Sequence, residues 1–149
     1  MTLPEKIPVE RMEDYHTHHI GKYENGNQFW GYETFVFTER PIPEGENWEK
    51  YRREYAVLYL FDKEGNFKET KYEYAGTTNS LKFDTNDKIE EMVSELGEIE
   101  YCDIEIKLFE IEIDGFKFGL IPNEESEMIE LQPSSTISFQ EPWDGEYYT

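Results

Sequence analysis

The sequence predicts an α+β fold: a mainly antiparallel β-sheet of six to eight strands with one helix, at about residues 85–96, packed on it. Three observations predict it. Short segments rich in aromatic and β-branched residues recur along the chain and are separated by turns of hairpin length. Only one segment repeats its apolar residues with a helical period. The length of 149 residues is close to the commonest size of one domain, so we expect a single domain over residues 1–149.

The first two strands are expected before residue 40. A short strand is predicted at Tyr15–Ile20, after an extended N-terminal segment, and a long one at Phe29–Thr38, which is rich in aromatic and β-branched residues. Prolines and a glycine in residues 39–50 predict a loop there. Trp48 lies in this loop, and we expect its ring to pin the loop to the body of the protein.

The middle of the chain contains the clearest patterns. The run Tyr55–Phe61 is continuously apolar, which is typical of a central strand buried on both faces, and a hairpin turn leads from it to a strand at Phe67–Ala75. The helix follows, with N-cap oxygens near Asp84 and a glycine at its C-terminal end. Its apolar face is expected to consist of Ile89, Met92, Val93 and Leu96.

The strand Ile104–Ile113 changes its apolar phase at Leu108–Phe109. Because the period of a strand is two residues, this shift predicts either a β-bulge or a strand that leaves one layer for another. Asp114-Gly115 then predicts a two-residue hairpin turn. The strands expected after it are Phe116–Ile121, Met128–Leu131 and Thr136–Phe139, and an aromatic tail is expected to fold back onto the body.

The negative net charge of the chain favours some classes of binding partner over others. The chain has 34 acidic and 14 basic side chains, a formal net charge of −20 at pH 7. Residues 84–130 hold 16 acids and 3 bases, whereas residues 1–83 hold 15 acids and 11 bases. Negative charge of this size repels nucleic-acid phosphates, so we expect no nucleic-acid partner. A basic protein partner is favoured instead.

Composition favours a cytoplasmic protein with no membrane partner. No segment approaches the roughly 20 apolar residues of a membrane span, and the first residues lack the apolar run of a signal peptide. Cys102 is the single cysteine, so no internal disulfide is possible. The acids beside it are expected to raise the pKa of its thiol, which favours a small buried side chain over a nucleophile.

Carboxylates in the acidic third of the chain form the candidate partner-binding site. Carboxylates two residues apart on a strand form a rigid row, which loses little entropy when it meets a basic surface. A solvated face that only keeps the protein in solution has the same pattern, and both interpretations stay open. The candidate residues are Glu98, Glu100, Glu105, Glu110, Glu112 and Asp114.

The histidines offer an alternative site. On a strand, Asp14, His16 and His18 would point to one face, at a spacing of about 7 Å, and could hold part of a Zn²⁺ or Fe²⁺ site. Structural zinc normally needs four dedicated ligands, so an ordinary polar strand face is favoured, and we expect no stoichiometric metal and no cofactor. The sequence also lacks a phosphate-binding glycine loop, a nucleophile elbow and a Cys-x-x-Cys motif. We therefore expect no enzyme.

Four groups of residues carry a resemblance to known proteins. They are Tyr15–Tyr23, Tyr55–Leu58 with Ala75–Thr78, Tyr101–Ile104 running through Asp114–Leu120, and Pro142–Gly145. In these stretches the chain resembles a group of small bacterial proteins that carry the label "formate hydrogenlyase regulatory protein". The resemblance covers most of the chain and implies a bacterial, cytoplasmic regulator without enzymatic activity. It implies no particular functional residues.

Two functions from different classes are therefore considered. The first is a non-catalytic acidic binding protein that inhibits or regulates a basic protein partner. Immunity proteins do this to secreted nucleases, whose phosphate-binding active sites are basic. The second is a metal- or small-ligand-binding enzyme that uses the N-terminal histidine cluster. A gene for a large toxin-like partner beside this one would favour the first, and a metal bound to the purified protein would favour the second.

Overall fold

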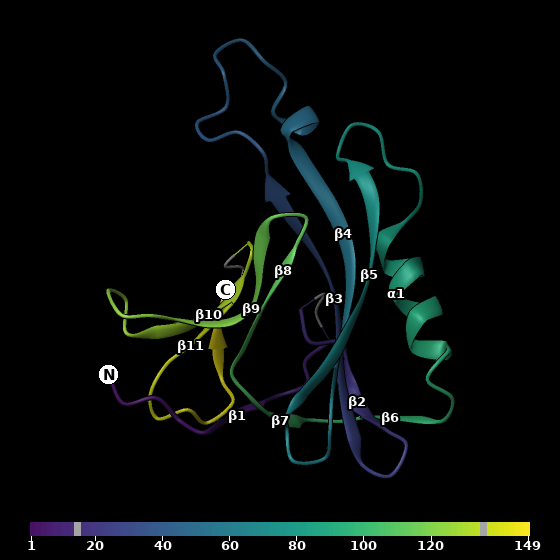
Figure 1. Cartoon of the computed structure of the whole chain (residues 1–149), viewed down its shortest axis with the longest axis vertical. Helices are drawn as coiled ribbons and strands as arrows, with labels where there is room; N and C mark the ends of the chain where they lie inside the picture. The colour runs from purple at the N-terminus through teal and green to yellow at the C-terminus, as the bar shows by residue number, and fades with distance from the viewer. Residues whose placement is uncertain (14–15, 135–136) are drawn as a thin grey trace.

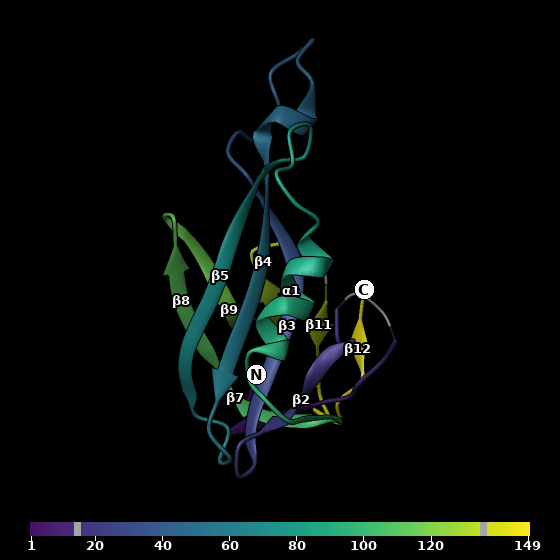
Figure 2. The same cartoon turned by 90° about the vertical axis from the view of Figure 1, so that its right-hand side faces the viewer.

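Two five-stranded antiparallel sheets face each other, and helix α1 (Thr85–Ser94) covers the far side of one of them (Figures 1 and 2). A computed structural model describes residues 1–13, 16–134 and 137–149. The prediction of a mainly antiparallel fold with one α-helix is confirmed for these residues. The expected six to eight strands are too few, because the described residues form twelve strands in three sheets.

The central sheet carries helix α1 on one face and the second sheet on the other. Its long strands β3 and β4 run side by side with ten paired residues, from Gln28 opposite Phe61 to Phe37 opposite Arg52. A 3₁₀ turn, η1 (Trp48–Tyr51), directly precedes β4. The strands, in their order across the sheet, are β5 (Phe67–Thr77), β4 (Arg52–Phe61), β3 (Asn27–Phe37), β2 (His19–Tyr23) and β6 (Ile99–Tyr101).

The second sheet is formed by the C-terminal third of the chain. Its longest strand, β9, pairs with a strand on each side. The aromatic tail folds back as expected, because β12 pairs with β11. In their order across the sheet, the strands are β12 (Tyr147–Tyr148), β11 (Ser138–Phe139), β10 (Met128–Gln132), β9 (Phe116–Asn123) and β8 (Phe109–Ile113). Thr136, where β11 was expected to begin, lies outside the described residues.

A two-stranded ribbon closes one end of the space between the sheets. It pairs β1 (Lys6–Val9) with β7 (Ile104–Lys107), and its alternate residues Ile7, Val9, Ile104 and Ile106 are buried in the same core. The phase change at Leu108–Phe109 is explained here: β7 belongs to the ribbon, whereas β8 begins directly afterwards in the second sheet. The strand therefore leaves one layer for another, which was one of the two expected outcomes.

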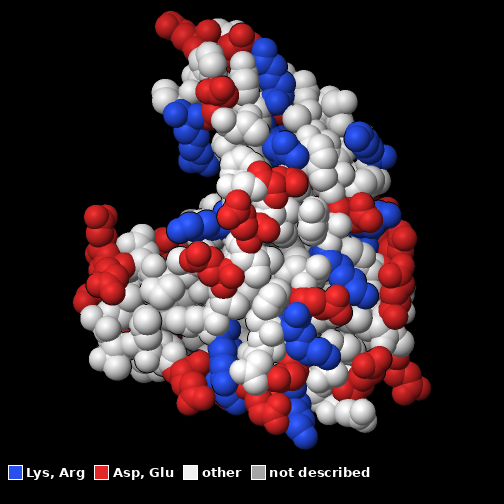
Figure 3. Space-filling view, in the orientation of Figure 1, with Lys and Arg blue, Asp and Glu red and all other residues white. Residues whose placement is uncertain are grey.

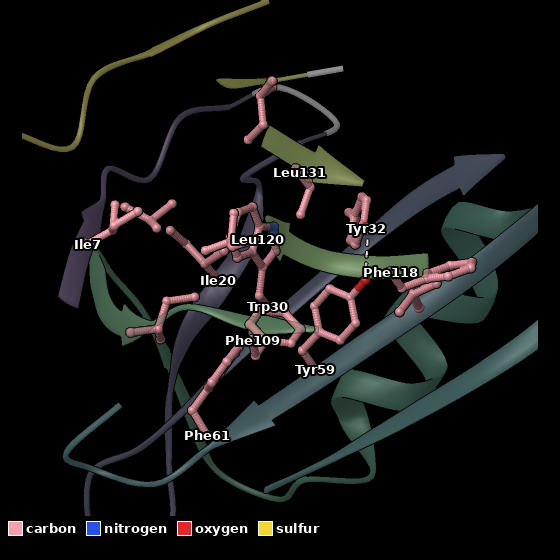
Figure 4. Packing of buried hydrophobic residues seen from close by; sticks show 14 of the residues in the cluster. Ile7, Ile20, Trp30, Tyr32, Tyr59, Phe61, Phe109, Phe118, Leu120 and Leu131 are labelled. Atoms are coloured by element: carbon pink, nitrogen blue, oxygen red, sulfur yellow. Dashed lines mark hydrogen bonds between the residues drawn. The ribbon is translucent and has the colours of Figure 1, made fainter. Parts of the chain in front are cut away.

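The long central strand β4 is buried on both faces, as its continuous apolar run predicts. Tyr55, Val57, Tyr59 and Phe61 point into the core between the sheets, whereas Ala56, Leu58 and Leu60 lie under the helix. Figure 4 shows the first of these cores, with the hydroxyl groups of Tyr32 and Tyr59 joined 3.0 Å apart among apolar side chains. The buried residues of β4, β7 and β9 include Val57, Leu58, Leu60, Phe61, Ile104, Ile106 and Phe118.

Helix α1 packs on the sheet with the expected face. Asp84 is its N-cap, where a side-chain oxygen accepts the backbone N–H of Asp87 at 3.0 Å. Ile89, Met92 and Val93 are buried, and the helix passes so close to Gly31 of β3 that a Cβ atom there would lie 2.9 Å from Ile89. The helix ends at Ser94, two residues earlier than predicted, although Leu96 still packs inward.

Candidate functional site

Glu110 and Glu112, called here the acidic row, lie on β8 at the edge of the second sheet. They alternate with Phe109, Ile111 and Ile113, of which the first and last are buried, so the two carboxylates face solvent. Within the described residues β8 has a strand neighbour, β9, on one side only. The acidic row is therefore a fixed pair of exposed charges on a free sheet edge, as its alternation predicts.

Asp114, which follows the acidic row, is held by the fold. It is the first residue of the predicted turn to β9 and has a φ of 52°, a backbone conformation that aspartate tolerates better than most residues. Its carboxylate accepts the hydroxyl of Tyr55 at 2.8 Å and lies 3.4 Å from the guanidinium of Arg53. Burial raises the pKa of Tyr55, and the hydrogen bond to Asp114 adds to this. Asp114 thus ties the second sheet to β4 and has less freedom to meet a partner.

The other predicted acids lie on different elements. Glu98 and Glu100 are exposed at β6, the edge of the central sheet next to β2, and Glu100 is opposite Lys22 in the pairing. Glu105 is exposed on β7. The structure therefore brings Asp114 together with the acidic row, but it places Glu98 and Glu100 on the edge of the other large sheet. The six candidates do not share one strand or one sheet.

The histidines do not lie on one strand face. His16 and His18 occupy a turn before β2, which begins at His19, so the expected alternation does not apply, and Asp14 lies outside the described residues. The rings of His18 and His19 are edge to face, with centroids 4.7 Å apart. Among the described residues, no three His, Cys, Asp or Glu side chains lie close enough together to hold a metal ion.

His19 is the most constrained of these histidines. Its side chain is buried and its Nε2 lies 3.2 Å from the Oδ1 atom of Asn86, near the start of α1. Burial lowers the pKa of His19, and the bond to Asn86 opposes this only in part. The ring centres of Tyr101 and His19 are 6.2 Å apart, and the guanidinium of Arg11 lies over the Tyr101 ring, 4.6 Å from its centre. These contacts fix β2, β6 and α1 together and give His19 a structural role.

Residues 35–53, called here the arm, extend beyond the rest of the molecule at the top of Figure 1. The arm consists of the ends of β3 and β4 with the segment between them. It contains four acids and four bases, so it is neutral in a chain whose net charge is −20: Glu39, Glu44, Glu46 and Glu49 against Arg40, Lys50, Arg52 and Arg53. Sequence reasoning treated it only as a connecting loop.

Aromatic rings on the arm stack with arginines outside both buried cores. The guanidinium of Arg52 lies 3.7 Å from the ring centre of Phe35, and that of Arg40 lies 4.7 Å from Phe37. Trp48, which remains 45% exposed, stands 6.4 Å from Phe37. Trp48 therefore packs the predicted loop on the ends of β3 and β4, outside both buried cores. The sequence signal that could have revealed this cluster was the pair Phe35 and Phe37, close to a tryptophan and two arginines.

A groove separates the arm from the second sheet. It consists of two adjoining hollows of about 300 and 310 Å³ that share Phe37 and Arg40. Figure 3 shows the hollow between the upper projection and the lower lobe. Ile42 lies at its arm side, and Phe116 and Pro133 line it from the second sheet. Phe116 begins β9 directly after the turn at Asp114, so the groove lies at the end of the hairpin that carries the acidic row.

Cys102 lies between β6 and β7 and is partly buried. Burial raises the pKa of its thiol, with a further contribution from Glu100. The direction agrees with the sequence prediction, although burial contributes more than the neighbouring acids. A thiol in this environment is a poor nucleophile.

Comparisons with known proteins complete the description of the site. No helix in the described residues has the length and apolar character needed to cross a membrane. Searches against protein-family models, curated proteins and solved structures find no match to this chain.

Proposed function

We propose that the chain is a non-catalytic binding protein that inhibits or regulates a basic protein partner. The observation that carries the proposal is the position of the acidic row, exposed on a free edge strand whose hairpin ends at a groove lined by aromatic and polar side chains. The net charge of −20 attracts a basic surface at long range. The groove and the arm supply the apolar contact area that charge alone lacks.

The arm supports the proposal through its residue types. Tryptophan, tyrosine and arginine dominate the binding energy of protein interfaces, and Trp48 and Arg40 are both exposed on the arm. Three further aromatic residues, Phe35, Phe37 and Phe116, line the groove. Phe35 and Phe37 lie outside both buried cores and are only partly buried, so a partner would complete their burial, whereas Phe116 already packs against the core between the sheets.

The acidic row and the groove are expected to act on different rate constants. Charge attraction over about 8–10 Å at physiological salt speeds association, whereas buried apolar contacts slow dissociation. A basic enzyme inhibited in this way would be steered by Glu110 and Glu112 and then retained by contacts with Phe37 and Arg40.

The test begins with affinity capture from the native host and identification of the captured protein. Association and dissociation rates are then measured by surface plasmon resonance at several salt concentrations. Reversing both charges of the acidic row, Glu110→Lys with Glu112→Lys, is expected to slow association about tenfold or more and flatten its salt dependence. The matched control is Glu124→Lys with Glu125→Lys, an exposed pair in the β9–β10 turn.

Two results would overturn the proposal. One is a captured partner that is acidic. The other is an equal change of the association rate in both double variants, because the acidic row would then act only through its contribution to the net charge. In the groove, Phe37→Ala is expected to raise the dissociation rate without changing the salt dependence of association.

A further inference from the structure

A second pocket lies at the opposite end of the central sheet from the arm. It has a volume of about 330 Å³ and forms where the β2–β3 turn, the β4–β5 turn and the β1–β7 ribbon meet, at the lower end of Figure 1. Its charged and amide lining consists of Lys6, Lys22, Lys63, Asn25, Gln28, Asp103 and Glu105. Three of the 14 basic side chains of this acidic protein therefore line one pocket.

Among the described residues, none of the three lysines lies within 4.0 Å of a carboxylate, whereas five other bases of the chain do. Lys50, Arg52, Arg53, Lys88 and Lys107 each lie within 4.0 Å of a carboxylate. Within residues 1–13, 16–134 and 137–149, no such ion pair involves Lys6, Lys22 or Lys63. Lysines from three separate segments therefore meet at one pocket without a close ion pair, although Lys22 stands opposite Glu100 in the β2–β6 pairing.

A fourth lysine increases the positive charge beside the pocket. In the β1–β7 ribbon, Lys6 stands directly opposite Lys107. Like charges in this position destabilise a strand pair. The carboxylate that pairs with Lys107, that of Glu5, lies 3.9 Å away and is 81% exposed, so it neutralises Lys107 poorly. An anion in contact with both ammonium groups would reduce the repulsion.

The backbone around the lysines is fixed by hydrogen bonds and close packing. Gln28, which is buried, donates to the carbonyl of Asp62 at 3.1 Å and accepts the backbone N–H of Glu105 at 2.7 Å. Gly65, with a φ of 88°, packs so tightly on β7 that a Cβ atom there would lie 2.8 Å from the carbonyl oxygen of Glu105. The segments that carry Lys22, Lys63 and Lys107 are therefore held in place without a ligand.

The two acids of the lining reduce the positive charge but do not cancel it. Asp103 already accepts the backbone N–H of Arg11 at 2.7 Å. Glu105 is exposed on the same face of β7 as Lys107, which stands opposite Lys6, so it offsets part of their charge. Against these two charges stand three lysines in the lining and Lys107 beside it. The remote acids of the chain are largely screened at physiological salt, where the Debye length is about 8 Å.

We propose that this lysine pocket binds a small multivalent oxyanion, a phosphate or a polycarboxylate. Ammonium groups act on such ligands as point charges, so several lysines favour a multiply charged anion over a monovalent one. A volume of about 330 Å³ lies at the lower end of the range for small-molecule sites. The site is opposite in sign to the acidic row, so it serves a ligand other than the basic protein partner.

The test titrates the whole chain with sodium pyrophosphate and, separately, with sodium citrate, by isothermal titration calorimetry at constant ionic strength. Saturable binding of one ion per chain is expected for at least one of the two. Lys22→Ala with Lys63→Ala is expected to weaken it about tenfold or more, because removing two charges from the pocket removes most of the attraction. Binding of pyrophosphate alone would identify a phosphate ligand, and binding of citrate alone a polycarboxylate.

The matched control is Lys82→Ala with Lys117→Ala, two exposed lysines that do not line the pocket. Circular dichroism of both double variants checks that they fold. The proposal is overturned if neither anion binds saturably up to about 10 mM, a weak limit for a specific site. It is also overturned if the control variant loses as much affinity as the pocket variant, since binding would then reflect net charge alone.

Discussion

The two faces of the central sheet are packed by different kinds of side chain. Under the helix the buried residues are mostly aliphatic, with Ala56, Leu58 and Leu60 from β4 meeting the apolar face of α1. Between the sheets the share of aromatic residues is higher, eight of the 20 buried residues: Trp30, Tyr32, Tyr55, Tyr59, Phe61, Phe109, Phe118 and Phe139. The helix approaches closely over Gly31, whereas two packed sheets stand about 10 Å apart. Large rings help to fill that gap, so a chain with only 37% hydrophobic residues can build two cores when 16% of its residues are aromatic.

The largest expected effects test this difference directly. Phe61→Ala in the core between the sheets is expected to lower the free energy of unfolding by about 3–5 kcal/mol. Leu58→Ala under the helix is expected to lower it by about 2–5 kcal/mol, because both side chains are fully buried. Urea unfolding followed by circular dichroism measures both. A loss below about 1 kcal/mol for Leu58→Ala would show that the helix side is loosely packed.

A smaller effect is expected from the hydroxyl pair in the aromatic core. Tyr59→Phe leaves the Tyr32 hydroxyl bonded to the carbonyl of Gln132 at 3.2 Å, so the loss is expected to be about 0.5–1.5 kcal/mol at neutral pH. Burial raises the pKa of Tyr32 and Tyr59 in the folded state. Unfolded tyrosines ionise from about pH 10, so stability is expected to fall above that pH. Denaturant titrations at pH 8 to 11 should show a shallower fall for Tyr59→Phe than for the parent chain.

His19 provides a test on the helix side. Its pKa is lowered by burial, so the unfolded chain binds a proton more readily below about pH 6.5, and stability falls as the pH drops through that value. One group contributes at most about 1.4 kcal/mol per pH unit. His19→Gln is expected to flatten the pH dependence between pH 5 and 7, relative to the matched variant His18→Gln. If the free energy of unfolding depends on pH with the same slope in both variants, His19 does not contribute to the pH dependence.

The smallest effect is expected for the exposed edge of the second sheet. Glu110→Lys with Glu112→Lys is expected to lower the free energy of unfolding by at most about 1 kcal/mol, since exposed charges contribute little to stability and the main loss comes from a like charge opposite Lys117. Asp114→Ala is the contrast, because this variant loses the bond to Tyr55 and should be destabilised by about 1–3 kcal/mol. The melting temperatures of the two variants distinguish charges that only face solvent from the Asp114 carboxylate, which is bonded within the fold.

Local patterns predicted the parts of the fold that depend on local physics. The continuous run of β4, the helical period of α1 and the turn at Asp114-Gly115 each specify their own structure. The sequence also predicted part of the division into layers, since the phase change at Leu108–Phe109 marks the passage from the ribbon to the second sheet. Short strands such as β1 and β6 were missed because they exist through pairing with distant segments, which leaves no local pattern.

The candidate site was predictable only where exposure follows from alternation. Glu110 and Glu112 face solvent because Phe109 and Ile113 are buried beside them. The bond from Tyr55 to Asp114 joins residues far apart in the chain, so no spacing could reveal it. The same holds for the lysine pocket, whose Lys6, Lys22 and Lys63 come from separate segments. The groove beside the arm likewise depends on how the second sheet packs against β3.

The β1–β7 ribbon has a consequence for the order in which a nascent chain can fold. The hairpins of β3, β4 and β5 pair with near neighbours and can form as soon as those residues are synthesised. β1 has to wait, because Lys6 to Val9 pair with residues 104–107. At ribosomal speeds of about 5–20 residues per second, that interval is roughly 5–20 s. During it Ile7 and Val9, which end fully buried, stay exposed near the start of the chain, where a chaperone can reach them.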